Sequence, residues 1–268
     1  MPSATPQTLL PLTRPLTIGE TLDAALRLFR VSLPRCLPIA LLTVVAGQLP
    51  TALDFARGLS ATSMLHKDFR WWFVAVISGL VNLVLWNALL RRQHATATGN
   101  PTTMRSDLGA GLHAAPATFL LLVIYFAAVA LGTLLLIVPG LYLSIALSFC
   151  SIAVVVNGER IKQSIASSLR LTRGSWWRTS SVFGVMFVMV AVMYVFAGFV
   201  GVMLAQFARG DSAVFGAVTA VSVALIGALL MPLTSAVLLV QYAELQVRRL
   251  GGDLAARLDG VPRTATSG

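Results

Sequence analysis

The sequence predicts an all-α polytopic membrane protein with six transmembrane helices in three hairpins and amphipathic helices at one membrane interface. The first observation is composition, because 57% of the 268 residues are hydrophobic and only 11% are charged, against about 25% charged in an ordinary soluble domain. The second is length, since several apolar runs reach the ~20 residues that a helix needs to cross hydrocarbon. The third is that every second loop between the apolar runs is rich in Lys and Arg. Lipid cannot hydrogen-bond a backbone, so such runs must be helical.

Six apolar segments are expected to span the membrane, and a short turn joins the third to the fourth. This turn is Val138, Pro139 and Gly140 in the motif IVPGLY. Proline cannot continue a helix and glycine permits the dihedral angles of a reversal, so we expect a tight hairpin here. The spans are expected at 33–53, 71–90, 116–137, 140–156, 179–204 and 213–240.

The basic residues predict an orientation. Sixteen of the twenty Lys and Arg lie on one side of the spans, the arginine-rich side. Cytoplasmic loops are enriched in these residues, so we expect this side, with both termini, to face the cytoplasm. No cleavable signal peptide is recognised, so the first span is expected to act as the targeting signal. The four basic residues of the arginine-poor side are Arg57, Lys67, Arg70 and Arg209.

Two basic amphipathic segments, 21–35 and 164–178, each precede a predicted hairpin. At a constant offset of 143, six of their fifteen positions are identical, and each carries an apolar stripe opposite its arginines. Such a helix lies in the membrane interface, with its arginines among phosphates. The common register favours an internal duplication; the alternative is independent origin of similar sequences. The predicted lipid- or partner-binding residues are Arg27, Arg30, Arg35, Arg170, Arg173 and Arg178.

The expected organisation is a single membrane domain over 16–247 between two flexible tails, 1–15 and the cytoplasmic 248–268. Interfacial helices are expected at about 17–31 and 159–174. A third at about 105–114 follows if DLGAGLHAAP is a degenerate copy of the repeat. Three copies of one orientation would be related by an axis along the membrane normal.

Four stretches resemble a group of bacterial inner-membrane proteins: LTIGETLDAALRLFR, IVPGLYLSIALSF, SSLRLTRGSWWR and MPLTSAVLLVQYAEL. The group includes the YciC-like proteins and the membrane domain fused to some glycerophosphodiester phosphodiesterases. The resemblance implies a helical membrane fold in the bacterial inner membrane. It does not imply phosphodiesterase activity, because that chemistry belongs to a separate soluble domain for which this chain has no counterpart.

The residues point away from catalysis. His66, His94 and His113 have no metal-ligand neighbours at helical spacing, and none of the ten acidic residues lies in the middle of a predicted span, where a carboxylate-driven transporter needs one. No nucleotide-binding glycine loop is present. We therefore expect no enzyme, no metal and no cofactor, and we assign the net charge of +10 to topology and lipid contact rather than to nucleic acid.

Few polar residues lie within the spans. Gln48, Asn82 and Asn87 are expected to hydrogen-bond between helices, with contact to a substrate as the alternative. Pro232 removes a backbone donor from the sixth span, which predicts a kink there.

Two functions follow from this pattern. The first is a non-enzymatic protein that contacts anionic lipids or scaffolds a membrane partner, a second copy of itself included, through its basic helices. The alternative is a small transporter or permease for an amphipathic or anionic solute. A polar cavity that reaches Asn82 and Asn87 at the midplane favours transport, and a solidly packed bundle favours the scaffold.

Overall fold

A computed structural model describes residues 9–10, 12, 14–57, 67–100, 102–206 and 212–259. These residues form helices and turns and contain no strand. Six helical segments are long and apolar enough to cross a membrane, which confirms the predicted fold class. The helices are α1 (Ile18–Ala56), α2 (Phe69–Ala97), α3 (Met104–Leu135), α4 (Ile137–Ala146), α5 (Cys150–Asn157), α6 (Ile161–Thr172), α7 (Trp176–Gln206) and α8 (Ser212–Asp259).

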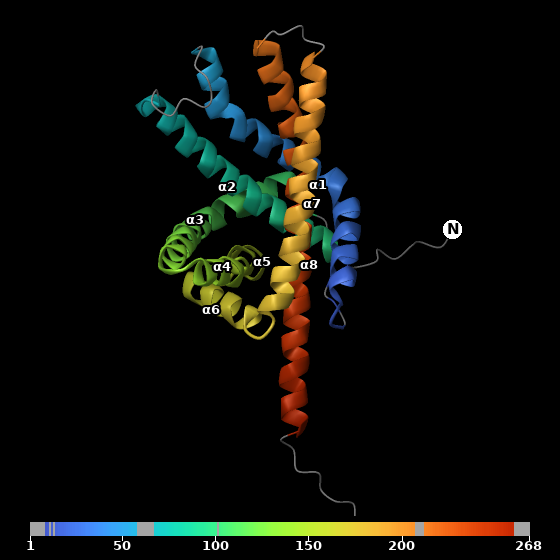
Figure 1. Ribbon diagram of the computed structural model, residues 1–268. Helices are drawn as coiled ribbons and strands as arrows, with labels where there is room; N and C mark the ends of the chain where they lie inside the picture. The colour runs from blue at the N-terminus through green and yellow to red at the C-terminus, as the bar shows by residue number, and fades with distance from the viewer. Residues whose placement is uncertain are drawn as a thin grey trace, which may run out of the picture.

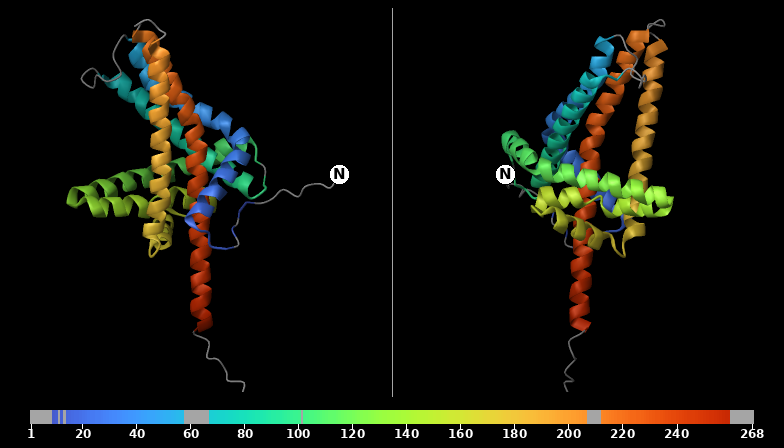
Figure 2. Two further views of the ribbon diagram at one scale, coloured as in Figure 1. Left: turned by 45° about the vertical axis from the view of Figure 1, so that its right-hand side comes forward. Right: turned by 90° about the vertical axis from the view of Figure 1, so that its left-hand side faces the viewer.

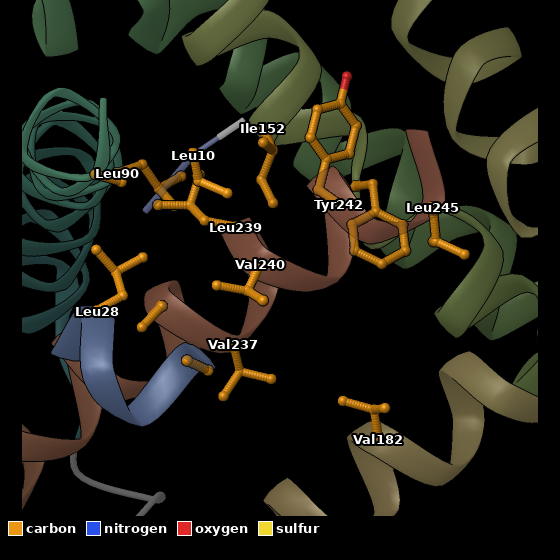
Figure 3. Close-up of a cluster of buried hydrophobic side chains, with 14 of the residues drawn as sticks. Leu10, Leu28, Leu90, Ile152, Val182, Val237, Leu239, Val240, Tyr242 and Leu245 are labelled. Carbon is orange, nitrogen blue, oxygen red and sulfur yellow. The ribbon is translucent and has the colours of Figure 1, made fainter. Parts of the chain in front are cut away.

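Helix α8 is the central element of the bundle, since it contacts α1, α2, α5, α6 and α7. Figure 1 shows that α1 ends, α2 begins, α7 ends and α8 begins at the same end of the bundle, which is the arginine-poor end. The main apolar core lies nearer the opposite end. There Leu28, Leu90, Ile152 and Val182 surround the stretch of α8 that contains Val237 (Figure 3).

The first predicted interfacial helix is not separate from the first span. Helix α1 runs for 39 residues through three prolines, and its ribbon changes direction between its two halves (Figure 1). Pro34 and Pro38 lie in the first turns of the predicted span at 33–53, directly after the predicted interfacial segment. A proline lacks the N–H that would bond the carbonyl four residues earlier, so it bends a helix.

The α3–α4 hairpin differs from the expected turn in two ways. The chain reverses at Leu136, a single extended residue between the two helices, whereas the turn was expected at 138–140. Pro139 lies in the first turn of α4, where its missing N–H costs nothing because that group has no helical partner. Gly140 serves close packing instead: a Cβ atom there would lie 2.9 Å from the Cα of Thr133. Figure 2 shows that this hairpin runs across α7 and α8.

The predicted fourth span, 140–156, is broken into two helices. Helix α4 ends at Ala146 and α5 begins at Cys150. The break leaves carbonyl groups without helical donors, and the Ser168 hydroxyl of α6 donates to one of them, that of Ala146, at 2.6 Å. A side chain far along the chain therefore stabilises a break that local sequence does not reveal.

Both predicted flexible tails are partly ordered. Leu10 is buried against the main core, and the N–H groups of Leu9 and Leu10 donate to the carbonyl of Ala97. At the other end, α8 continues as a helix to Asp259 and extends beyond the rest of the bundle (Figures 1 and 2). The segment expected at 105–114 is part of α3 rather than a separate interfacial helix. Residues 1–8 and 260–268 lie outside the described residues.

One buried side chain joins three of the long helices. The Gln93 amide nitrogen of α2 donates to the Ser32 hydroxyl of α1 and to the Pro232 carbonyl of α8, each at 2.9 Å. The Ser235 hydroxyl of α8 donates to the Gln93 amide oxygen. The whole carboxamide is thus satisfied inside the protein, as an apolar environment requires.

We predict that Gln93→Leu lowers the free energy of unfolding by about 1–3 kcal/mol, because it removes the three buried hydrogen bonds that join α2 to α1 and α8. Unfolding of the purified protein in detergent measures this change. Gln48→Leu is the matched control, since the half-buried Gln48 side chain makes no hydrogen bond within the described residues. Equal stability of the two variants would contradict the conclusion that the Gln93 hydrogen bonds stabilise the packing of α1, α2 and α8.

A second prediction concerns the crossing of α2 and α3. A Cβ atom at Gly111 would lie 2.5 Å from the carbonyl oxygen of Val84, a backbone atom that cannot move aside. Gly111→Ala should therefore lower the free energy of unfolding by about 1–3 kcal/mol. At Gly109, on the same helix, a Cβ atom meets nothing within 4 Å. Gly109→Ala should be neutral or stabilising by up to about 1 kcal/mol, and a loss as large as that at Gly111 would refute the close approach.

Candidate functional site

Four of the six predicted arginines are free. Arg27 and Arg30 on α1, Arg170 on α6 and Arg173 just after it are all exposed. Within the described residues, their side chains make no hydrogen bond or ion pair. Their guanidinium groups therefore remain available to an external acceptor.

The two repeat segments bury the same face. In the first, Thr21 and Ala25 are fully buried, and in the second Ser164 and Ser168 occupy the positions 143 residues later and are also fully buried. The predicted apolar stripes lie beside this face; Thr172 of the second stripe is fully buried, and the other stripe residues are half-buried to exposed, with Leu169 at 36%. Small side chains thus allow close packing on the bundle. Half-buried stripe residues such as Leu22 and Ile165 pack against the apolar clusters beside this face, and the arginines face outward.

Arg178 has a different environment. Its guanidinium lies 3.4 Å from the carboxylate of Glu244, which is completely buried, and it also donates to the carbonyl of Leu16. Arg248 of α8 binds the same carboxylate at 2.8 Å. Two arginines therefore share one buried acid where α7 meets α8, and this contact holds Arg178 in position.

Arg35 lies in a related arrangement. Its own side chain is exposed, but its carbonyl accepts a hydrogen bond from Arg92 of α2. Arg92 binds the fully buried Asp107 of α3 at 2.8 Å, and Arg91 approaches the same carboxylate at 3.9 Å. The Thr102 hydroxyl also donates to Asp107. As at Glu244, a buried carboxylate on the arginine-rich side, that of Asp107, therefore lies close to two arginines.

The arginine-poor end carries its own polar cluster. Asp54 accepts from Lys67 and, at 3.1 Å, from the indole of Trp71. Asp68 caps the start of α2, and hydrogen bonds from the Arg57 side chain and the Trp71 N–H lower the pKa of its carboxyl. These pairs use most of the few charges at this end, which leaves the free arginines concentrated at the other.

Of the three polar residues expected to hydrogen-bond between helices, only one does so within the described residues. Asn87 joins α2 to α3, because its amide donates to the Thr118 hydroxyl at 2.8 Å and to the Gly111 carbonyl at 3.3 Å. The Asn82 amide instead donates to the Ser78 carbonyl of its own helix. Gln48 makes no contact of this kind among the described residues. The prediction of an interhelical hydrogen bond is therefore confirmed for Asn87 alone.

Asn82 and Asn87 line two different cavities. Asn82 borders a groove of about 320 Å³ between α1, α2, α7 and α8. Asn87 borders another, of about 250 Å³, formed by α2, α3, the α4–α5 region and α8. Most of the groove lining is apolar, and Thr43, Tyr194 and Thr234 are its other polar residues. Among the described residues, Asn82 and Asn87 therefore line separate cavities, whereas transport was expected to use one polar cavity that reaches both.

Sequence reasoning missed three polar residues that the structure makes central. Gln93, Asp107 and Glu244 all lie outside the predicted spans and were assigned to no role, yet each is fully buried. The spacing of Glu244 and Arg248, four residues apart on one helix, was a readable signal for an ion pair. No local signal pairs Asp107 with Arg92, because the contact crosses from α3 to α2.

The described residues contain no group of three or more His, Cys, Asp or Glu side chains that would hold a metal ion. His66 lies outside the described residues. Cys36 and Cys150 are buried and unpaired. Since Arg27, Arg30, Arg170 and Arg173 are exposed and unpaired, the arrangement on the arginine-rich side supports electrostatic binding of an anion.

Comparison with known proteins adds no assignment. No family model, curated protein or solved structure matches this chain.

Proposed function

We propose that this multi-pass membrane protein is non-enzymatic and binds anionic lipids through its arginine-rich side, which faces the cytoplasm of a bacterium. The observation that carries the proposal is the set of four exposed, unpaired arginines, Arg27, Arg30, Arg170 and Arg173. Arg27, Arg30 and Arg170 lie on helices that pack against the bundle by equivalent faces, and Arg173 directly follows α6. We call these four residues the arginine array.

The distribution of ion pairs supports this reading. Asp107 and Glu244 neutralise part of the charge of Arg92, Arg178 and Arg248, whereas the four array arginines form no ion pair within the described residues. A basic residue near an anionic membrane surface contributes about 1 kcal/mol to binding. Four together give an attraction large enough to retain acidic lipids around the protein.

The apolar surface supports a location in the bilayer. Much of α7 is exposed and apolar, including Val185, Phe187 and Phe196, and such a surface is stable in contact with acyl chains. Trp177, at the start of α7, is 80% exposed. Tryptophan is enriched at the level of the headgroups, which places the first turn of α7 at the interface.

Transport of an amphipathic or anionic solute is the second candidate. Its support is the groove beside Asn82, where Thr43 and Tyr194 add polar groups. The Asn82 amide, however, already binds within its own helix, and the groove carries no charged residue. Lipid binding therefore accounts for more of the structure. Membership of the YciC-like group remains part of this proposal.

We predict that reversing charge at the four array arginines (Arg27→Glu, Arg30→Glu, Arg170→Glu and Arg173→Glu) abolishes retention of anionic lipid. The physical reason is that four attractive contacts become repulsive ones. Native mass spectrometry of the protein extracted from membranes counts the phosphatidylglycerol and cardiolipin molecules that remain bound.

The same four positions changed to Lys serve as the matched control, because they keep the charge and should keep the lipid. Arg70→Glu tests the opposite end of the bundle and should leave retention unchanged. Unaltered retention in the fourfold Glu variant would refute lipid binding by the array.

A further inference from the structure

We propose that the start of α7 forms a specific binding site for the phosphate group of an acidic lipid, at a cavity lined by two arginines. This inference rests on the proposed function and goes further, because it assigns one defined pocket for a single headgroup. The cavity has a volume of about 440 Å³. Its lining residues are Gly174, Ser175, Trp176, Trp177, Arg178 and Arg248.

Local sequence forms this pocket. Gly174 has a φ of +84°, a value that side chains with a Cβ rarely adopt, and it ends the helical run before α7 begins at Trp176. At the corresponding position of the first repeat stands Val31, where α1 continues without interruption. The second repeat segment therefore exposes a helix start where the first has none.

The new helix start favours an anion. The first N–H groups of an α-helix have no partner within the helix, and the helix dipole gives this end a partial positive charge. Phosphate groups bind at such ends in many proteins. Here the helix is 31 residues long, and two guanidinium groups line the cavity beside its first turn.

Glu244 holds the side chains of Arg178 and Arg248 in position by ion pairs and does not itself line the cavity. Its carboxylate is fully buried and is not part of the lining, while Arg178 and Arg248 are. Together the three groups carry one net positive charge. The Nε–H of Arg178 is buried and has no acceptor among the described residues. A phosphate oxygen would satisfy the donors that the carboxylate does not use.

The tryptophans identify the source of the phosphate. Trp176 stacks on Tyr142 with ring centroids 5.9 Å apart, so it is fixed, and the exposed Trp177 packs edge-on against it at 4.8 Å. Indole rings prefer the headgroup level of a bilayer. A phosphate that reaches Arg178 and Arg248 from this level is attached to a lipid whose glycerol and acyl chains contact the indoles.

The repeat provides independent support. Arg35 corresponds to Arg178, and it also lines a cavity, of about 280 Å³, together with Arg92. In both places the second arginine is bound to a buried carboxylate, that of Asp107 or Glu244. Only the cavity beside Arg178 also has a helix start and two tryptophans in its lining. We therefore assign the lipid to that cavity.

The test compares two adjacent arginines of α8 in the purified full-length protein in detergent. Dioleoylphosphatidic acid should raise the unfolding temperature of the unaltered protein, and dioleoylphosphatidylcholine should not. Arg248→Gln should weaken the phosphatidic acid effect by about tenfold or more, as expected when a charge-assisted hydrogen bond is lost. Arg249→Gln removes the same charge from an exposed residue outside the cavity. This variant should weaken the phosphatidic acid effect by no more than about twofold.

Trp177→Ala keeps the test independent of folding, because this exposed side chain leaves the ion pairs intact. It should weaken binding of phosphatidic acid and leave any effect of inorganic phosphate unchanged. If millimolar phosphate alone reproduces the full stabilisation through Arg248, the lipid assignment is overturned in favour of a free anion. If Arg248→Gln and Arg249→Gln behave alike, the pocket is overturned, while the fourfold array variant still tests the proposed function separately.

Discussion

The buried carboxamide of Gln93 is the contact on which the arrangement of the long helices depends. Three helices of this protein have apolar surfaces that could slide against one another, because lipid and neighbouring helices are equally apolar and hydrophobic burial does not distinguish them. Hydrogen bonds to Ser32, Pro232 and Ser235 exist in one arrangement only. They fix how α1 and α2 cross α8 on the arginine-rich side of the bundle.

Two buried carboxylates divide the arginines into two classes. Arg92, Arg178 and Arg248 are bound to Asp107 or Glu244 and have defined positions, whereas Arg27, Arg30, Arg170 and Arg173 are exposed. A buried charge is tolerated only when it is paired, so the acids are part of the fold. The same pairing holds two cationic groups beside the first turn of α7, where they can act on a ligand.

The two segments that align at an offset of 143 bury equivalent positions of their helices. Thr21 and Ser164, and likewise Ala25 and Ser168, occupy equivalent positions and are equally buried. The two copies diverge afterwards, because Val31 permits a continuous helix and Gly174 ends one. The first segment therefore belongs to one continuous helix, whereas the second forms an interfacial helix followed by a new helix start.

The sequence by itself determined the six apolar segments, the side that carries the arginines and the outward face of Arg27 and Arg170, because these depend on local composition and on helical periodicity. The α4–α5 break, the reversal at Leu136 and the burial of Gln93, Asp107 and Glu244 were decided by tertiary structure alone. Each depends on a partner from another helix, such as Ser168 for the break and Arg92 for Asp107. A polar residue just outside an apolar run is read from the sequence as solvated, and only the packing of the helices shows that it is buried and paired.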